Sequence, residues 1–312
     1  MKRSLVLAAV LVLCAPLASQ AADGALPAAI ASASSAAEKF DVGPMLVERH
    51  GSKGSPMILI PGLSSGPYVW DNAVREFGKD HVLYLVTLPG FNGHPAASGD
   101  LVAGVDQWLG QLIATRKLVK PVLVGHSLGA TFSIAYAEKH SDQIGGVIAI
   151  DGLPVMPGTE NLALEQRPAM AAGMKQRMAG VTKATFGSMQ KSFMRSSLGV
   201  MDPATADAIA ERSATSDPAA VTEYMSQILA LDLRGALPEI KVPVLLISPF
   251  HEADMIAAGM PMSVADKTGY YTSLMAGTPR LTVVPVSPSR HFAMQDQPQQ
   301  VADAMRAYLK GL

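Results

Sequence analysis

One serine in this chain lies in a pattern that suggests nucleophilic chemistry. Ser127 is the centre of Gly125-His126-Ser127-Leu128-Gly129, between the apolar run 121–124 and a stretch with helical character. A sharp strand-to-helix turn would push the serine out of the sheet, with its hydroxyl exposed above the start of the helix. Glycines suit so tight a bend, because side chains there would collide with the neighbouring backbone. We therefore predict that the Ser127 hydroxyl is a nucleophile.

The same pattern occurs a second time, in Gly62-Leu63-Ser64-Ser65-Gly66. More candidate strands precede Gly125 than precede Ser64. A small residue, Ala130, follows Gly129, where a helix must pack closely on a sheet, whereas Gly66 is followed by proline and tyrosine. Both observations favour Ser127 over Ser64.

A serine hydroxyl is a weak nucleophile and needs a neighbouring base, usually a histidine that a carboxylate orients. His291 is the best placed of the seven histidines, since it follows the last predicted strand and precedes the final helix. Loops at the carboxyl ends of parallel strands are where active sites assemble. His126 adjoins Ser127, but the turn must direct its side chain elsewhere, and we expect it to pack beside the turn.

Three carboxylates could orient His291. Asp254 and Glu252 follow the predicted strand 242–247, and Asp151 ends the predicted strand 146–150. All three satisfy the order serine, acid, histidine along the chain. The sequence favours Asp254, then Glu252, then Asp151, and it leaves open that no acid is present.

Attack on a carbonyl creates an alkoxide that backbone N–H groups must stabilise. Leu128 follows the nucleophile and would supply one N–H at the start of the helix. The glycine-rich loop after the predicted strand 57–60 would supply the other, and Leu63 is the residue we expect. This assigns the second glycine-serine pattern a role without making Ser64 the nucleophile.

The elements that must position these residues alternate along the chain. Short apolar runs that end in turn signals predict parallel strands joined by helices. We expect strands near 45–49, 57–60, 82–87, 121–124, 146–150, 242–247 and 281–286. The amphipathic stretch 297–309 is predicted to be the closing helix.

The alternation stops between residues 153 and 240, where helix formers dominate. Met170, Met174 and Met178 recur there with helical spacing, so they form one stripe that either lines an apolar pocket or packs in a core. The predicted fold class is α/β: a mostly parallel open sheet flanked by helices, with a helical cap insertion. We assign 41–152 and 241–312 to the core and 153–240 to the cap.

The N-terminus has the features of a secretory signal peptide. Lys2-Arg3 precede the apolar stretch 4–17, and small residues up to Ala21 suit cleavage there. Residues 1–21 are therefore predicted to be a signal peptide and 22–40 a flexible leader. We expect a bacterial periplasmic or secreted protein with no stable membrane anchor after cleavage.

Composition excludes several other classes of chemistry. Cys14, the single cysteine, lies in the predicted signal, and Leu13 before it does not fit lipid attachment. Disulfides, thiol catalysis and cysteine metal sites are thus not expected in the mature chain. His251 lacks the second histidine that a zinc helix needs, because Met255 stands there. A net charge of −1 indicates no nucleic-acid partner. We predict no cofactor and no metal.

Together these motifs resemble the α/β-hydrolase superfamily, in its branch with a helical cap. The resemblance covers roughly 45–152 and 241–312, and it depends on Leu59–Leu63, Leu88–Gly93, the serine turn, and His291-Phe292 before Gln297-Pro298. It implies a serine hydrolase that cleaves a small carboxylic ester, or an amide or lactone, through an acyl-enzyme. Serine at 127 argues against the branches that use aspartate there.

The chain also departs from many relatives. Pro61 and Thr87 replace the histidine and aspartate that often precede the two glycine motifs, and residues 255–278 could form a second small lid. An aminopeptidase, a cofactor-free perhydrolase and a catalytically silent ligand-binding relative remain alternatives. The sequence leaves the physiological substrate and the oligomeric state open.

Overall fold

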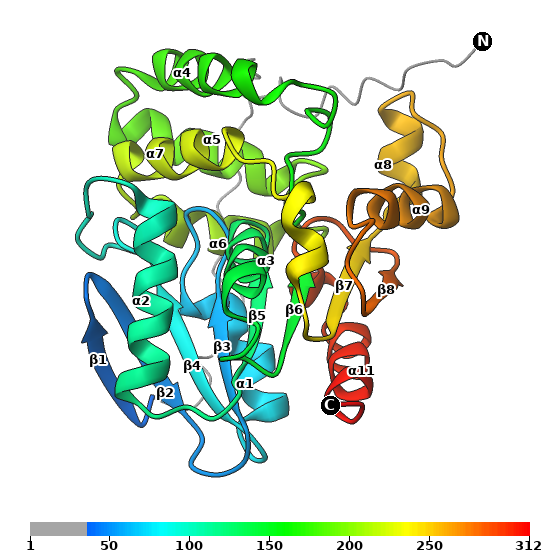
Figure 1. Cartoon of the computed structure of the whole chain (residues 1–312). Coiled ribbons are helices and arrows are strands. Elements are labelled where there is room, and N and C mark those ends of the chain that lie inside the picture. The colour runs from blue at the N-terminus through cyan, green and yellow to red at the C-terminus, as the bar shows by residue number, and fades with distance from the viewer. Residues whose placement is uncertain (1–35) are drawn as a thin grey trace.

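The computed structural model describes residues 36–312, so the predicted signal peptide and most of the predicted leader lie outside the described residues. An eight-stranded sheet forms the centre of the domain (Figure 1). Its spatial order is β1 (Glu38–Val42), β2 (Met45–His50), β4 (Val82–Thr87), β3 (Pro56–Ile60), β5 (Val122–His126), β6 (Gly146–Ile150), β7 (Val244–Pro249) and β8 (Leu281–Val286). The strand β1 was not predicted, and it begins within the expected leader.

Strands β1 and β2 pair antiparallel at one edge, and β2 also runs antiparallel to β4. All the remaining pairs are parallel. The carboxyl ends of β3, β5, β6, β7 and β8 therefore meet at one edge of the sheet. This confirms the predicted fold class of a mostly parallel sheet flanked by helices.

Alternate residues of the central strands pack into two separate cores. Ile58, Leu123 and Val147 belong to one core, and their chain neighbours Leu59 and Val124 belong to the other. Successive side chains of a strand point to opposite faces, so a strand buried on both faces is apolar throughout. This explains why the central strands read as unbroken apolar runs rather than as alternating patterns.

Helices cover both faces of the sheet. One core includes residues of α2 (Leu101–Thr115) and α3 (Leu128–His140), and the other includes residues of α1 (Asp71–Phe77) and α11 (Pro298–Leu309). The buried side of α11 is a narrow stripe made of Val301, Ala302 and Met305. That spacing is one face of an amphipathic helix, as predicted for the closing helix.

The chain between β6 and β7 is helical. It contains four α-helices: α4 (Arg167–Met178), α5 (Lys183–Arg195), α6 (Pro203–Ser213) and α7 (Pro218–Leu229). Two short 3₁₀ helices, η3 (Leu164–Gln166) and η4 (Arg234–Glu239), lie before α4 and after α7. Figure 1 shows α4, α5 and α7 stacked beyond one end of the sheet. The isolated bridge between Val155 and Asp232 joins the beginning of this insertion to its end.

The methionine stripe lies inside this insertion. Met174 is buried in a small cluster with Leu229 of α7, and Met170 and Met178 pack against that cluster. The stripe is therefore the packing face between α4 and α7, which is the core alternative of the two that the sequence left open.

Arg167 fastens the insertion from within. Its side chain is completely buried, and it donates hydrogen bonds to the carbonyls of Thr159 and Leu231 at 2.8 and 3.0 Å. It also forms an ion pair with Asp232 at 3.1 Å. One guanidinium thus ties both ends of the insertion together, because its planar group of donors can reach several acceptors at once.

Replacing Arg167 with methionine should destabilise the protein. The apolar side chain leaves buried carbonyls without donors and removes one partner of an ion pair, and we expect a loss of about 3 kcal/mol in the free energy of unfolding. Urea unfolding of the wild type and Arg167→Met measures this difference. The exposed Arg177→Met on the same helix is the matched control. Equal midpoints for both variants would contradict the structural role of Arg167.

A second, smaller helical segment separates β7 from β8. It consists of α8 (Glu252–Ala257) and α9 (Val264–Leu274). In Figure 1, α9 lies near the ends of β7 and β8, and α8 stands beyond α9. The segment occupies the region 255–278, where the sequence suggested a second lid. The helix α9 packs on both of these strands.

Candidate active site

Ser127 stands on a strained turn between β5 and α3. Its φ and ψ are 53° and −118°, in a region that non-glycine residues rarely adopt. A Cβ on Gly125 would lie 2.2 Å from the Gly129 carbonyl, and one on Gly129 would lie 2.1 Å from the Ile60 carbonyl. Both positions thus require glycine, because the backbone approaches them too closely for any side chain, as the sequence pattern predicted.

Two other residues with a strained backbone lie near this turn. Ser64 and Asp151 also have positive φ, at 58° and 47°. They follow β3 and β6, the two strands beside β5. Strained residues persist where the surrounding structure holds them, and they often cluster at functional sites.

Asp151 faces His291. Its Oδ2 accepts a hydrogen bond from His291 Nδ1 at 2.5 Å, and its Oδ1 accepts one from the Tyr271 hydroxyl at 2.6 Å. Burial alone would raise the pKa of Asp151, but the charge and hydrogen bond of His291 outweigh it, with smaller help from Lys267 and Tyr271, and lower that pKa to about 2. Asp151 is therefore ionised at neutral pH, and its bond to Nδ1 leaves His291 Nε2 free to act as a base.

Ser127 lies beside Asp151. The Ser127 N–H donates to the carbonyl of Ile150, the residue before Asp151, at 2.9 Å. A Cβ on Gly152 would lie 2.4 Å from the Ser127 carbonyl oxygen. The serine turn and the acid thus occupy adjacent strand ends, in contact through their backbones.

His126 connects the serine turn to the histidine loop. Its ring is completely buried, 4.7 Å from the ring of His291 and 4.6 Å from that of Phe292. Its Nε2–H donates to the His291 carbonyl at 3.1 Å. Burial, together with the nearby His291, lowers the pKa of His126 to about 3. His126 therefore stays neutral at physiological pH and supports the backbone of His291.

Asp254 does not contact His291, and this corrects the acid that the sequence favoured. Its carboxylate accepts hydrogen bonds from Arg290 Nε and Nη2 at 2.7 and 3.0 Å, and it lies 2.8 Å from His251. Burial raises its pKa, but hydrogen bonds from Arg290 and His251 outweigh burial, and the pKa of Asp254 is lowered. Glu252 is exposed at the start of α8. Asp151, the third candidate, is the carboxylate that lies against His291.

The two expected oxyanion donors have free N–H groups. Among residues 36–312, no acceptor is recorded for the N–H of Leu63 or of Leu128. Leu128 is the first residue of α3, where an N–H has no partner within the helix. The Leu63 loop adjoins the Ser127 turn, because a Cβ on Gly62 would lie 3.2 Å from Ser127 Cβ.

Ser64 occupies this same loop and not a strand-to-helix turn. The Ser65 N–H donates to the Gly62 carbonyl at 3.1 Å, which closes a tight turn with Ser64 inside it. Ser64 is 1% exposed, and its hydroxyl has no hydrogen-bond partner in the described part of the chain. Its burial makes it a poor nucleophile for an incoming substrate.

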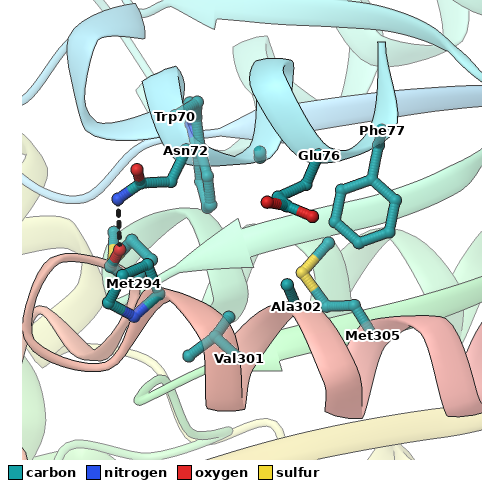
Figure 2. A pocket seen from close by; sticks show the side chains of 10 residues that line it. Trp70, Asn72, Glu76, Phe77, Met294, Val301, Ala302 and Met305 are labelled. Atoms are coloured by element: carbon teal, nitrogen blue, oxygen red, sulfur yellow. Dashed lines mark hydrogen bonds between the residues drawn. The ribbon is translucent and has the colours of Figure 1, made fainter. Parts of the chain in front are cut away.

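The loop after β8 that carries His291, and the short helix α10 (Ala293–Asp296) that follows it, are fastened at several points. Asn72 Nδ2 donates to the Met294 carbonyl at 3.0 Å, as drawn in Figure 2. Gln295 donates to the Val69 carbonyl at 2.8 Å. Ser289 N–H donates to the Phe250 carbonyl at 2.8 Å. These contacts hold His291 in place from both sides of the loop.

Figure 2 also shows a crevice between α1 and α11, which is separate from the site of Ser127, Asp151 and His291. It is narrow and mostly apolar, with Trp70, Phe77, Val301 and Met305 among its lining residues. Ser127, Asp151 and His291 do not line it. We assign it to helix packing.

The described residues hold no group of three His, Cys, Asp or Glu side chains arranged to bind a metal ion. Within residues 36–312, no helix is both long and apolar enough to cross a bilayer.

Comparison with known proteins identifies the family. The sequence profile described as the alpha/beta hydrolase family matches residues 57–304. The chain belongs to the alpha/beta hydrolase family. This hydrolase is therefore an enzyme of the superfamily that the sequence motifs resemble, and it carries the predicted fold.

Two relatives illustrate how far the similarity extends. The N-formylmaleamate deformylase of Pseudomonas putida is 25% identical over 202 residues, which cover 64% of this chain and 72% of that protein. The abhydrolase domain-containing protein abhd-5.2 of Caenorhabditis elegans is 28% identical over 105 residues, 31% of this chain but only 23% of the worm protein. The hydrolase thus spans less than a quarter of the worm protein's length.

Solved structures share the fold. The enol-lactonase from Burkholderia xenovorans LB400 superposes with a TM-score of 0.70 at 16% identity, over 88% of this chain and all of that one (100%). At this identity the likeness establishes the architecture of the hydrolase and leaves its substrate to other arguments.

Tyr271 is a residue near Asp151 that the sequence did not single out. It lies in α9, more than a hundred positions after Asp151 in the chain. In the sequence it looks like any buried position on one face of a helix, since Tyr271 and Leu274 are the buried residues of α9. Only the geometry relates it to the site.

Proposed function

We propose that this protein is a serine hydrolase that cleaves small carboxylic esters through an acyl-enzyme, with Ser127 as nucleophile, His291 as base and Asp151 as the orienting acid. The observation that carries the proposal is the 2.5 Å hydrogen bond between Asp151 and His291, one strand away from the strained Ser127 turn. Nε2 of His291, the ring nitrogen that does not bond Asp151, is then the base available to the serine.

In the first half of the reaction, Ser127 Oγ attacks the ester carbonyl carbon while His291 Nε2 takes the hydroxyl proton. The carbonyl π electrons move to its oxygen, and the N–H groups of Leu63 and Leu128 stabilise that alkoxide. Collapse of the intermediate expels the alcohol, which receives the proton back from His291. The acyl group stays on Ser127.

In the second half, His291 Nε2 removes a proton from water as its oxygen attacks the acyl carbon. The second tetrahedral intermediate releases the Ser127 oxygen, which regains the proton, and the carboxylic acid leaves. Asp151 stays ionised throughout and stabilises the imidazolium by charge and hydrogen bonding. No step calls for a group from outside the protein other than water.

Relatives support this chemistry at the level of acyl transfer. The neighbouring structure is that of an enol-lactonase, which by its name acts on a cyclic ester, and the Pseudomonas relative is named a deformylase of an N-formyl compound. The same constellation of residues can serve esters, lactones and amides. A panel of short-chain esters, lactones and aminoacyl amides, together with peroxide-dependent halogenation, would rank these substrates.

A fluorophosphonate probe tests the proposal directly. We expect the wild type to form a stoichiometric covalent adduct on Ser127, located by mass spectrometry of the tryptic peptide. Ser64→Ala is the matched control and should be labelled equally. A protein that is not labelled would be a silent ligand-binding relative, and labelling at Ser64 would overturn the assignment of the nucleophile.

We further propose that the chain is exported and cleaved after Ala21. The charged, apolar and small-residue regions of residues 1–21 support this. The mass of the protein recovered from the periplasm of an expressing bacterium should correspond to a chain that begins at Ala22. Recovery of the full-length chain from the cytosol would contradict export.

A further inference from the structure

A tyrosine of the second helical segment completes the hydrogen bonding of the acid. The hydroxyl of Tyr271 lies 2.6 Å from Asp151 Oδ1, while His291 Nδ1 lies 2.5 Å from Oδ2. We propose that Tyr271 is a positioning residue, which fixes the rotation of Asp151 and thereby the orientation of His291. This inference rests on the proposed function of the two residues that it serves.

Tyr271 is well placed for this task because it is itself held in place. Its side chain is buried, and it belongs to the core formed with α3 and β6. Lys267 Nζ lies 5.1 Å from the centre of its ring, and donates to the Pro249 carbonyl at 2.5 Å. The neighbouring Tyr270 hydroxyl donates to Glu160 at 3.1 Å, which ties α9 to the cap.

A buried carboxylate with one free oxygen would retain a costly unsatisfied acceptor. It could also rotate about its terminal bond, which is a soft torsion with a broad distribution. Because Tyr271 occupies Oδ1, the other oxygen is left facing His291 in a single orientation. The phenol is a neutral donor here, since burial, with the nearby charge of Asp151 adding to it, raises the pKa of Tyr271 well above its usual value.

The strained backbone of Asp151 explains why such support is useful. Its φ of 47° places it directly after β6, in a conformation that Asp tolerates better than most residues but that still costs energy. The side chain then leaves the sheet edge toward α9, and a donor on α9 is in reach. No other side chain is recorded as a donor to Oδ1 within residues 36–312.

The charged and titratable groups around His291 come from several elements. The groups that act on the Asp151–His291 pair directly are His126 in β5 and Lys267 and Tyr271 on α9. Arg290, next to His291 in the chain, is in turn paired with Asp254, which also contacts His251, and its N–H donates to Asp296. Removal of the Tyr271 hydroxyl changes one of these contacts and leaves every formal charge unchanged. A change in the pH profile therefore reports a change in the interaction between Asp151 and His291.

The test compares Tyr271→Phe with Tyr270→Phe in the full chain. We expect Y271F to lower kcat about tenfold, the loss typical of one hydrogen bond to a charged group, with KM changed less than about twofold. Without the phenol, the full negative charge of the carboxylate faces His291. The acid limb of the kcat/KM profile should then move to higher pH by about half a unit. Y270F should keep the wild-type profile.

The outcomes separate this inference from the proposed function. A wild type that neither hydrolyses esters nor reacts with the fluorophosphonate defeats the proposed function itself. If the wild type reacts and Y271F matches Y270F in kcat and in pH profile, the inference about Tyr271 is wrong. A rise in KM at constant kcat would also overturn it, because that result indicates a substrate contact.

A second variant covers the case in which Y271F melts below the assay temperature. 3-Fluorotyrosine at position 271 keeps the ring and is a stronger donor, so the acid limb should move to lower pH instead. An unchanged limb in that protein would contradict the proposal. The two substitutions thus shift the profile in opposite directions, which a general loss of structure would not do.

Discussion

Replacing Ser127 by alanine removes turnover of a chromogenic short-chain ester, with kcat/KM lower by about 10⁵-fold. The alanine has no hydroxyl to form the acyl-enzyme, and the remaining groups only bind the substrate and polarise its carbonyl. The fold should tolerate the change, because Ser127 is partly exposed at the turn and its side chain does not cap the helix that follows.

Two measurements accompany this prediction. The melting temperature of Ser127→Ala should stay within a few degrees of the wild type, since no buried contact of the hydroxyl is lost. Ser64→Ala should retain wild-type activity, although it removes the serine of the second glycine-serine pattern. A Ser127→Ala protein that is folded and fully active would refute the nucleophile and, with it, the proposed function.

The sequence predicted the sheet well because its central strands are buried on both faces. A strand such as β6 reads as five apolar residues, and a run of that length between turn signals has few other interpretations. The edge strand β1 was missed for the opposite reason. It is half exposed and carries charged residues such as Glu38 and Lys39, so its composition resembles that of a leader.

The strained Ser127 turn was readable because it imposes local requirements on the sequence. Gly125 must be glycine because the backbone of Gly129 approaches it closely. Gly129 must be glycine because the backbone of Ile60, at the end of the adjoining strand β3, approaches it closely. Such constraints fix the residue type at positions close together in the sequence, so a short pattern can reveal them. The same holds for His291, which follows directly from the end of β8.

The carboxylate that contacts His291 could not be read in this way. Asp151 and Asp254 both follow a parallel strand, and both fit the chain order of the three residues. What separates them is the partner of Asp254: Arg290, next to His291 in the chain, holds that carboxylate with two hydrogen bonds. Pairing between residues so far apart in sequence depends on tertiary packing, which no local pattern encodes. Tyr271 escaped notice for the same reason.

Replacing Asp151 by asparagine should lower kcat by about 10⁴-fold, the loss expected when a neutral group replaces the orienting acid of a serine triad. The amide cannot stabilise an imidazolium by charge, and its N–H₂ can favour the tautomer of His291 whose Nε2 already carries a proton. Steady-state ester hydrolysis at pH 7 to 9 measures the loss. Labelling by the fluorophosphonate should slow in parallel, because both reactions need the same proton transfer.

Asp254→Asn is the matched control, and it should give the reverse pattern. It breaks a bidentate ion pair that is mostly buried, so we expect the free energy of unfolding to fall by about 2 kcal/mol while kcat changes less than about tenfold. Asp151→Asn keeps the size of the side chain but removes a charge that the folded state stabilises, so it should also lose stability, by no more than Asp254→Asn does. Because the two residues follow neighbouring strands and undergo the same substitution, the pair separates catalysis from stability. Full activity in Asp151→Asn together with loss in Asp254→Asn would return the acid to Asp254, as the sequence first favoured, and would require the histidine loop to rearrange when substrate binds.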